Sequence, residues 1–326
     1  MKRRVWVFLI ACIAVVFASS VAVFAKEYTM VCIPKLRSPW FNQMENGLLR
    51  AGKDFGVEVY QQAPASADEA EQARLIGDAI NQGVDAILVV PNNATSLEPV
   101  FARAKGQKIA VLTHESPDQK NADFDIEMID NVKFGEKAME LMVERMGTSG
   151  KFVIFVGSLT VPAHNIWADA AVELAKDKYP GLVQVADRYP VSEDQSAARQ
   201  TALEILTAHP DIKGFLCFGS QGAPGAAQAV REKGLSDKVC VIGTTSPKQA
   251  EQYILDGSMD YSILWDPGEA AYVMVYLSKL LLDGKGSEIV DGMNIPNIGE
   301  AKIEGINVLF DRPLIVTKDN VTDYDF

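Results

Sequence analysis

The chain has 326 residues and a net charge of −12, with 48% hydrophobic and 23% charged residues, which are globular proportions. The length predicts two domains, and the acidic charge argues against a nucleic-acid binder or a protein that docks on anionic lipid. Four cysteines are too few for a disulfide scaffold, and three histidines leave little room for a multi-histidine metal site.

The first 25 residues are predicted to be a secretory signal peptide. A basic start at 2–4 precedes an apolar run over 5–20, and Val23-Phe24-Ala25 suits cleavage after Ala25. Two alternatives stay open. One is an uncleaved membrane anchor, which the short apolar run disfavours, and the other is a lipoprotein modified at Cys12. We expect export across the inner membrane and a periplasmic location.

The stretch that follows alternates strand-like and helix-like segments. We expect strands at 29–34, 57–60, 86–90 and 109–113, and helices at 40–55, 68–82 and 96–105. Gly56 and Gly83 are placed to end the first two helices. The strands are continuously apolar rather than alternating, which is typical of a parallel sheet covered by helices on both faces.

The same pattern begins again after an acidic stretch at 118–130, which is most simply a solvated segment that crosses between two lobes. The expected helices lie at 132–146, 165–178, 195–208, 226–233, 248–255 and 268–282. The expected strands lie at 151–157, 182–185, 214–218, 239–243 and 261–265. The tail from 283 to 326 is expected to be irregular, with short strands such as 314–317.

These two halves predict an α/β protein with two lobes, each a parallel sheet flanked by helices. The chain is expected to cross between the lobes near 127–131, 262–266 and 310–316. Open α/β sheets bind ligands at the carboxyl ends of their strands. A cleft between the two lobes is therefore the expected site.

Three cysteines lie in apolar runs that read as strand interiors: Cys32, Cys217 and Cys240. We expect buried free thiols that pack as small hydrophobic residues. A Cys217–Cys240 disulfide is the alternative, because neighbouring parallel strands could bring these residues together.

The loops offer little that is typical of an enzyme. The sequence Gly219-Ser220-Gln221-Gly222 lacks the spacing of a dinucleotide loop, a P-loop or a nucleophile elbow. His114 and Glu115 are adjacent on what should be an extended segment, so their side chains should point to opposite faces and not pair. No spacing of histidines or cysteines typical of a metal site occurs. We expect no catalysis, no metal and no cofactor.

The loop after the first strand instead favours ligand binding. It carries Lys35, Trp40, Phe41 and Asn42, which combine a cation, two aromatic rings and an amide. An aromatic face suits the C–H side of a sugar ring, and charged or amide groups suit its hydroxyls. Adjacent aromatics cannot share one helix face, so one ring is expected in the core and the other in the cleft.

Other strand ends add further candidates. His114 and Glu115 end the fourth strand, and Ser220 and Gln221 follow the strand at 214–218. The loop before the helix at 165–178 contributes His164 and Asn165, and Asp266 follows the strand at 261–265. The alternatives are that Glu115 is a solvated charge, that Asn165 is a helix N-cap, and that Asp266 caps the last helix while also facing the cleft.

Several short motifs resemble the periplasmic sugar-binding proteins of ABC importers, of the type I ribose- and galactose-binding group. The likeness is greatest to the branch that holds autoinducer-2-binding and rhamnose-type binding proteins. It covers essentially the whole chain after residue 25 and rests on the segments 33–36 (IPKL), 81–87 (NQGVDAI), 158–161 (SLTV), 165–167 (NIW), 264–266 (LWD) and 324–326 (YDF).

The resemblance implies a ligand for some residues and departs from the family at others. Lys35 matches a ligand-binding lysine of the autoinducer-2 receptors, and Glu115 stands where they have aspartate. Ala163 and His164 replace an Asp-Gln pair, and Phe218 and Ser220 stand where proline and alanine are usual. These departures favour an ordinary monosaccharide over autoinducer-2.

The resemblance also implies a two-lobe, type I periplasmic-binding-protein fold that closes on a sugar and delivers it to an ABC permease, as a monomer. A first lobe of 26–128 with 267–310 and a second of 129–266 with 311–326 are implied. An autoinducer-2 receptor and a sugar sensor for a chemoreceptor are the alternatives. A transcriptional regulator of the related repressor family is disfavoured, because a signal peptide stands where its DNA-binding domain would be.

Overall fold

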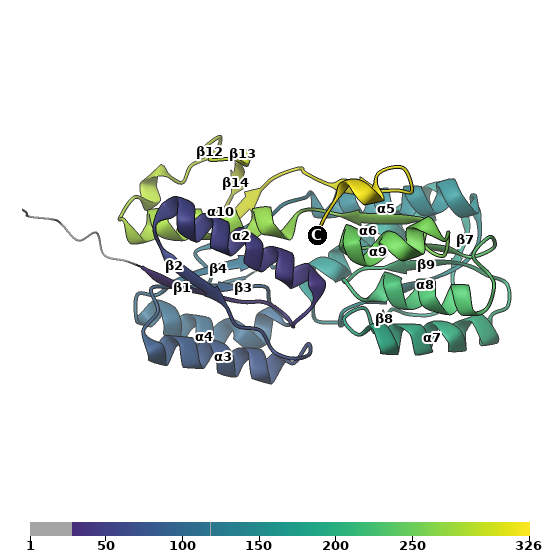
Figure 1. The fold of residues 1–326 in the computed structure, drawn as a ribbon, viewed down its shortest axis with the longest axis horizontal. Coiled ribbons are helices and arrows are strands. Elements are labelled where there is room, and N and C mark those ends of the chain that lie inside the picture. The colour runs from purple at the N-terminus through teal and green to yellow at the C-terminus, as the bar shows by residue number, and fades with distance from the viewer. Residues whose placement is uncertain (1–27, 118) are drawn as a thin grey trace, which may run out of the picture.

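A computed structural model describes residues 28–117 and 119–326. The predicted signal peptide and Cys12 lie outside the described residues. Two seven-stranded sheets, each between layers of helices, lie side by side along the long axis of the molecule (Figure 1). Each sheet with its helices is called a lobe below, the first lobe being the one that contains Thr29–Ile33.

The first sheet holds the five strands between Thr29 and Glu127 and two from the C-terminal tail. Its order is β14 (Lys302–Glu304), β15 (Asn307–Leu309), β5 (Phe124–Glu127), β4 (Ala110–His114), β3 (Ala86–Val89), β1 (Thr29–Ile33) and β2 (Glu58–Gln61). All neighbours are parallel except β14 with β15. Helices α2 (Pro39–Phe55) and α10 (Pro267–Leu282) lie side by side on one face, and α3 (Glu69–Gln82) and α4 (Ala94–Gly106) cover the other (Figure 1).

The second sheet has the order β16 (Leu314–Val316), β11 (Tyr261–Leu264), β10 (Cys240–Gly243), β9 (Ile212–Cys217), β6 (Ser149–Val156) and β7 (Gly181–Gln184), with β8 (Tyr189–Pro190) also beside β6. Its helices are α5 (Asn131–Met146), α6 (Pro162–Lys178), α7 (Gln195–Ala208), α8 (Gly222–Glu232) and α9 (Pro247–Leu255). β16 is antiparallel to β11. The predicted parallel sheets are confirmed, and strands from the tail add an antiparallel pair at one edge of each sheet.

The remaining short elements lie in the tail and near its end. They are β12 (Asn294–Ile295) paired with β13 (Gly299–Glu300), and the 3-10 helices η1 (Gly286–Glu288) and η2 (Val321–Asp323).

The chain passes between the lobes three times, as predicted. It crosses from β5 to α5, from β11 to α10, and from β15 to β16. Two of these crossings are tied together, because the amide of Phe310 donates to the carbonyl of Glu127 and that of Arg312 donates to the carbonyl of Met128. Three connected segments define one hinge and limit how the lobes can move against each other.

The predicted helix ends and the predicted free thiols are found in the structure. Gly56 and Gly83 adopt left-handed φ angles of 66° and 75° and end α2 and α3, as predicted. Cys32, Cys217 and Cys240 are buried and free. The register pairs Cys217 with Gly243, so Cys240 lies three residues away along the neighbouring strand, about 10 Å. The alternative of a disulfide is thereby ruled out.

The interpretation of 118–130 as a solvated segment is wrong. Phe124–Glu127 is β5, between β4 and β15, with Asp125 0% and Glu127 1% exposed. The burial of Asp125 is compensated because its Oδ1 accepts from Thr113 Oγ1 at 2.6 Å and from the amide of Ser116 at 3.1 Å. Acidic residues at alternate positions hid this strand, because buried parallel strands are usually apolar throughout.

Helices α5 and α6 approach closely at Gly135. A Cβ atom at this position would lie 2.2 Å from the carbonyl oxygen of Trp167. Only glycine allows this backbone contact beside Trp167, whose surface is 1% exposed.

Candidate functional site

A small cavity of about 10 Å³ lies where the carboxyl ends of the two sheets face each other. Its lining comes from strand ends and helix starts of both lobes: Lys35, Trp40, Phe41, Glu115, His164, Trp167, Glu193, Gly219, Ser220, Thr244 and Trp265. This volume holds about one water molecule, so the side chains of the two lobes are closed on one another.

Lys35 is the centre of the polar contacts in this cavity. Its Nζ donates to Glu115 Oε2 at 2.7 Å and lies 3.2 Å from Glu193 Oε1 and 3.0 Å from His164 Nε2. The side chains of Lys35, Glu115 and Glu193 are 3–5% exposed. A cation of the first lobe thus binds carboxylates from both lobes in a dry site, where charge-assisted contacts are strong.

These contacts set the protonation of the groups. Burial alone lowers the pKa of Lys35, but the charges of Glu115 and Glu193 raise it above its ordinary value. Burial raises the pKa of Glu115, but the Lys35 charge, followed by the nearby His164, takes it well below its usual range. Lys35 and Glu115 are therefore both charged across the neutral pH range.

His114 and Glu115 are close, contrary to the prediction. Glu115 has φ 61°, so the chain is not extended there, and its Oε1 lies 3.7 Å from His114 Nε2. His114 Nδ1 donates to the carbonyl of Ile126 at 2.6 Å, and Trp265 Nε1 donates to His114 Nε2 at 3.1 Å. Burial lowers the pKa of His114. The ring is thus a neutral support behind Glu115, and it does not line the cavity.

His164 lies in the first turn of α6, where its ring faces the amide of Gly157 and the ammonium group of Lys35. Its Nδ1 accepts from the amide of Gly157 at 3.1 Å, which leaves the proton of the neutral ring on Nε2. Burial, followed by the Lys35 charge, lowers the pKa of His164 and favours this neutral form. The Nε2–H and the Lys35 ammonium are then both donors, 3.0 Å apart. A ligand oxygen that approaches both nitrogens from the cavity side can accept from both.

Aromatic rings surround the charged groups. Trp265 packs edge-on against Trp40 and Trp167, with ring centroids 5.2 Å and 5.4 Å apart, and His164 stacks on Trp167 at 5.1 Å. Trp40 and Phe41 are 3% and 1% exposed and both line the cavity. The prediction that one ring would be in the core and the other in the cleft is wrong, because the cleft is closed and its wall is continuous with the core.

The sequence analysis missed Glu193, together with Gly219, Thr244 and the rings of Trp167 and Trp265. Glu193 follows the two-residue strand β8 and directly precedes Asp194, the N-cap of α7. Its Oε2 and Thr244 Oγ1 are buried without a hydrogen-bond partner. The usable signal was its place before a helix N-cap, the same strand-to-helix position that holds the other site residues.

Five predicted site residues lie outside the cavity. Asn42 is exposed on α2, and His114 lies behind Glu115 as described above. Gln221 lines a neighbouring cavity of about 560 Å³ at the mouth of the cleft and hydrogen-bonds to Gln249. The other two are Asn165 and Asp266, and both make hydrogen bonds to protein groups outside the cavity.

Asn165 and Asp266 each have partners near their own helix and one further away, since Arg188 donates to Asn165 Oδ1 and Gln43 donates to Asp266 Oδ1. Asn165 is the fourth residue of α6, whose N-cap is Val161, so the alternative that Asn165 is the cap is wrong. Its Nδ2 donates to the carbonyls of Ser158 and Val161. Asp266 caps α10, as predicted, by accepting from the amide of Gly268 at 2.8 Å.

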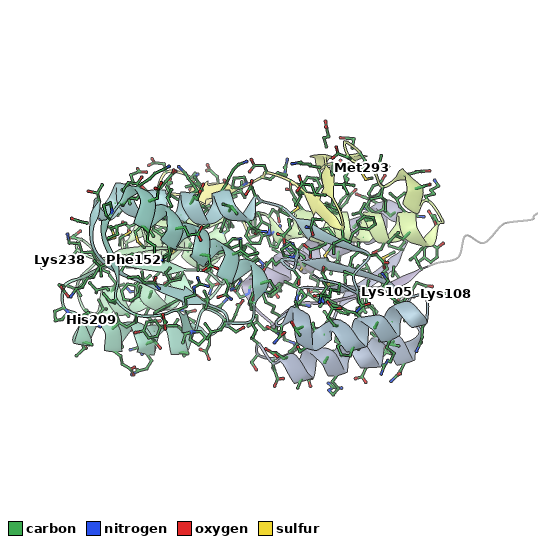
Figure 2. The ribbon with its side chains drawn as sticks, turned by 180° about the vertical axis from the view of Figure 1, so that it is seen from behind. Lys105, Lys108, Phe152, His209, Lys238 and Met293 are labelled. Carbon is green, nitrogen blue, oxygen red and sulfur yellow. The ribbon has the colours of Figure 1, made fainter. Side chains whose placement is uncertain are left out.

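The third histidine is remote from the site. Seen from behind, His209 and Lys238 lie at the outer end of the second lobe, and Lys105 and Lys108 at the outer end of the first (Figure 2).

In residues 28–117 and 119–326, no group of three His, Cys, Asp or Glu side chains is arranged to hold a metal ion. The helices of this same part are too short or too polar to cross a bilayer.

The chain matches known proteins along most of its length. A family profile described as a periplasmic binding protein domain matches residues 29–286. The D-allose-binding periplasmic protein of Escherichia coli K12 is 26% identical over 281 residues, which are 82% of this chain and 88% of that protein. The ribose import binding protein RbsB of Bacillus subtilis is 24% identical over 261 residues, with coverages of 80% and 83%.

Two solved structures are similar to the same degree. LsrB from Clostridium saccharobutylicum, in complex with AI-2, has a TM-score of 0.85 and 26% identity, covering 91% of this chain and 100% of that one. A solute-binding protein from Clostridium phytofermentans with bound L-rhamnose also has a TM-score of 0.85 and 26% identity, with coverages of 92% and 99%.

Proposed function

The chain belongs to the periplasmic binding protein family, and from this premise we propose that it captures one monosaccharide between its lobes and delivers it to an ABC transporter permease. The observation that carries the proposal is the closed site itself. Donors on Lys35 and His164 lie beside the buried acceptors Glu193 Oε2 and Thr244 Oγ1, which have no hydrogen-bond partner.

A sugar fits this set of groups. Its hydroxyls donate to the Glu193 and Thr244 oxygens and accept from Lys35 and His164, so that each buried polar group has a partner. The rings of Trp40, Phe41, Trp167 and Trp265 supply faces for its C–H groups. Binding a sugar in this way needs no catalytic group, and the relatives named above are binding proteins by name.

An ordinary sugar fits better than AI-2. The AI-2 complex and the L-rhamnose complex are equally similar in fold and identity, so similarity alone does not separate them. The site favours a sugar because Ala163 and His164 stand where the resemblance to autoinducer-2 receptors implies an aspartate and a glutamine. AI-2 remains the second candidate in the experiment below.

Binding requires the lobes to open. A cavity of about 10 Å³ is far below the roughly 300–1,000 Å³ of sites that hold small ligands. Rotation about the three crossings would admit the sugar, and contacts from both lobes would then favour closure. Closure gives the outer surfaces a spacing that a permease can recognise. We propose that sugar capture takes place in the periplasm. The protein would act there as a monomer after its predicted signal peptide has been cleaved.

The test is calorimetric titration of residues 26–326 with pentoses, hexoses, deoxyhexoses and AI-2. One sugar should bind at one site per chain without turnover. Glu193→Gln should weaken the affinity for this sugar about 10-fold, because a charged acceptor is lost. Asp266→Asn is the matched control, since asparagine also caps helices and Asp266 lies outside the cavity. Turnover, or no binding of any sugar, contradicts the proposal, and tighter binding of AI-2 selects the second candidate.

Small-angle scattering tests the closure separately. The radius of gyration should be smaller with saturating sugar than without it. Identical curves would mean that the ligand enters a rigid pocket, and the hinge would then have no part in binding.

A further inference from the structure

A second, larger cavity of about 840 Å³ lies at the hinge and shares no lining residue with the central site. It is bounded by two of the three crossings, at Ile129–Asn131 and Leu309–Asp311. Side chains of both lobes reach it, among them Ile166 on α6 and Asn307 on β15. A molecule in this cavity would therefore contact both lobes.

The floor of the hinge cavity is a cluster of buried side-chain oxygens, three of which accept no hydrogen bond from an amide or hydroxyl group. Glu127 and Asn307 line it, and their Oε1 and Oδ1 atoms are buried without a hydrogen-bond partner, as is Asp125 Oδ2 beside them. Asp125 and Asn307 are register partners on β5 and β15, and Glu127 lies two residues further along the same face of β5. Glu127 is 1% exposed.

A single proton on the two carboxyl groups satisfies only part of this cluster. Burial, and for Glu127 also the charge of Asp125, raise the pKa of both groups, so a proton is shared between them. The other groups that face them are Thr113, Ser116 and Glu115 around Asp125, and Asn131 beside Glu127. None of these is a cation, and Asn307 Oδ1 keeps no donor.

The rim of the cavity adds negative charge over an apolar wall. Six carboxylate residues line the cavity against two lysines. Lys133 pairs with Asp130 and Asp311, and Lys302 pairs with Glu304, so both cations are engaged at the rim. Asp291 and Glu300 remain exposed on the same rim. The apolar part includes Ile129, Ile166 and Phe310.

This pattern selects the class of ligand. A metal ion needs converging carboxylates, and no such group of three occurs among the residues that the structure describes. An alkyl ammonium group instead donates three hydrogen bonds from one end and packs its methylene groups on apolar side chains. We propose that the hinge cavity binds a linear aliphatic polyamine, with one ammonium on Glu127 and Asn307 and the next at the rim near Glu300.

Binding exchanges one proton for one ammonium. The proton shared by Asp125 and Glu127 passes to the solvent, and the ammonium group takes its place as donor to the carboxylate. Because the bound polyamine touches both lobes, it also changes the affinity of the central site, and the central ligand changes polyamine affinity by the same factor.

The experiment titrates residues 26–326 with spermidine, putrescine and butylamine in two buffers that differ in ionisation enthalpy. Spermidine should bind saturably and most tightly, with release of a proton. Glu127→Gln keeps a donor for Asp125 and should retain the fold while weakening spermidine binding about 10- to 100-fold. Glu300→Gln should weaken it about two- to five-fold, as for an exposed charge.

Glu173→Gln removes the same charge from the exposed surface of α6 and should leave binding unchanged. If Glu127→Gln does not fold, the exposed double variant Asp291→Asn with Glu300→Gln decides, and unchanged spermidine binding in it overturns the proposal. The proposal is also overturned if no amine binds saturably, if Glu127→Gln binds like the wild type, or if magnesium at equal concentration displaces spermidine.

Discussion

Replacing Lys35 by methionine tests the electrostatics of the closed cleft most directly. Lys35 Nζ lies 2.7 Å from Glu115 Oε2 and 3.2 Å from Glu193 Oε1, and all three side chains are at most 5% exposed. Methionine keeps much of the volume but leaves two buried carboxylates without their cation. Removing one partner of a buried ion pair costs about 3–5 kcal/mol of unfolding free energy, which we expect for Lys35→Met at neutral pH.

The loss should depend strongly on pH. In the wild type the pKa of Glu115 is lowered, so its contribution is present above about pH 4.3, the unfolded value, and is lost only as the pH falls. In Lys35→Met the Lys35 charge no longer opposes burial, which is the largest influence on Glu115, so the pKa of the Glu115 carboxyl group should rise. The folded state then binds a proton that the unfolded chain releases, so stability falls by about 1.4 kcal/mol per pH unit for each such group as the pH rises.

Urea unfolding at pH values near 5 and 8 measures this difference. For one protonated carboxyl group, the gap between wild type and Lys35→Met should widen by about 4 kcal/mol over that range. Lys35→Met with Glu115→Gln and Glu193→Gln should show no such widening. Lys238→Met, an exposed position at the far end of the second lobe, is the matched control (Figure 2). An equal loss at both pH values would refute the assignment of charges in the cleft.

Three further predictions concern packing and the thiols. Gly135→Ala places a Cβ atom 2.2 Å from the carbonyl oxygen of Trp167 and should lower the unfolding free energy by about 1–3 kcal/mol in urea, whereas Gly106→Ala, with no atom within 4 Å, should not. Trp265→Phe removes the donor to His114 Nε2 and should cost about 1–3 kcal/mol in the same assay; an unchanged midpoint would show that this hydrogen bond contributes nothing. Burial raises the pKa of all three described cysteines, so native protein at mildly alkaline pH should not react with a thiol reagent until urea unfolds it, and rapid labelling would contradict their burial.

The fold was predictable because its elements carry strong local signals. Apolar runs mark most strands of both sheets, and glycines such as Gly56 and Gly83 mark helix ends. β5 was not predictable in this way. Its alternating acidic residues are acceptable in a sheet interior only because Thr113 and Ser116 donate to Asp125, and such partners are fixed by tertiary structure.

Residues of the candidate site were predictable where they follow a strand with a clear apolar pattern in the sequence. Lys35, Trp40, Phe41, Glu115, His164 and Ser220 were all expected from that rule, and they line the cavity. Glu193 was missed because β8 has two residues and leaves no pattern in the sequence. The contact between His114 and Glu115 was missed because it depends on one left-handed backbone angle at a residue that is not glycine.

The composition of the two sheets has a consequence for the order of folding. The central strands and helices of the second lobe, β6 to β11, form one continuous stretch from 149 to 264. The first lobe lacks α10, β15 and β14 until residues 267–309 are available, although its first strand begins at Thr29. Domains fold as units, so we expect the second lobe to form first. The first sheet is then completed only when residues 267–309 fold. Until that point, the face of the first sheet that α10 later covers stays exposed.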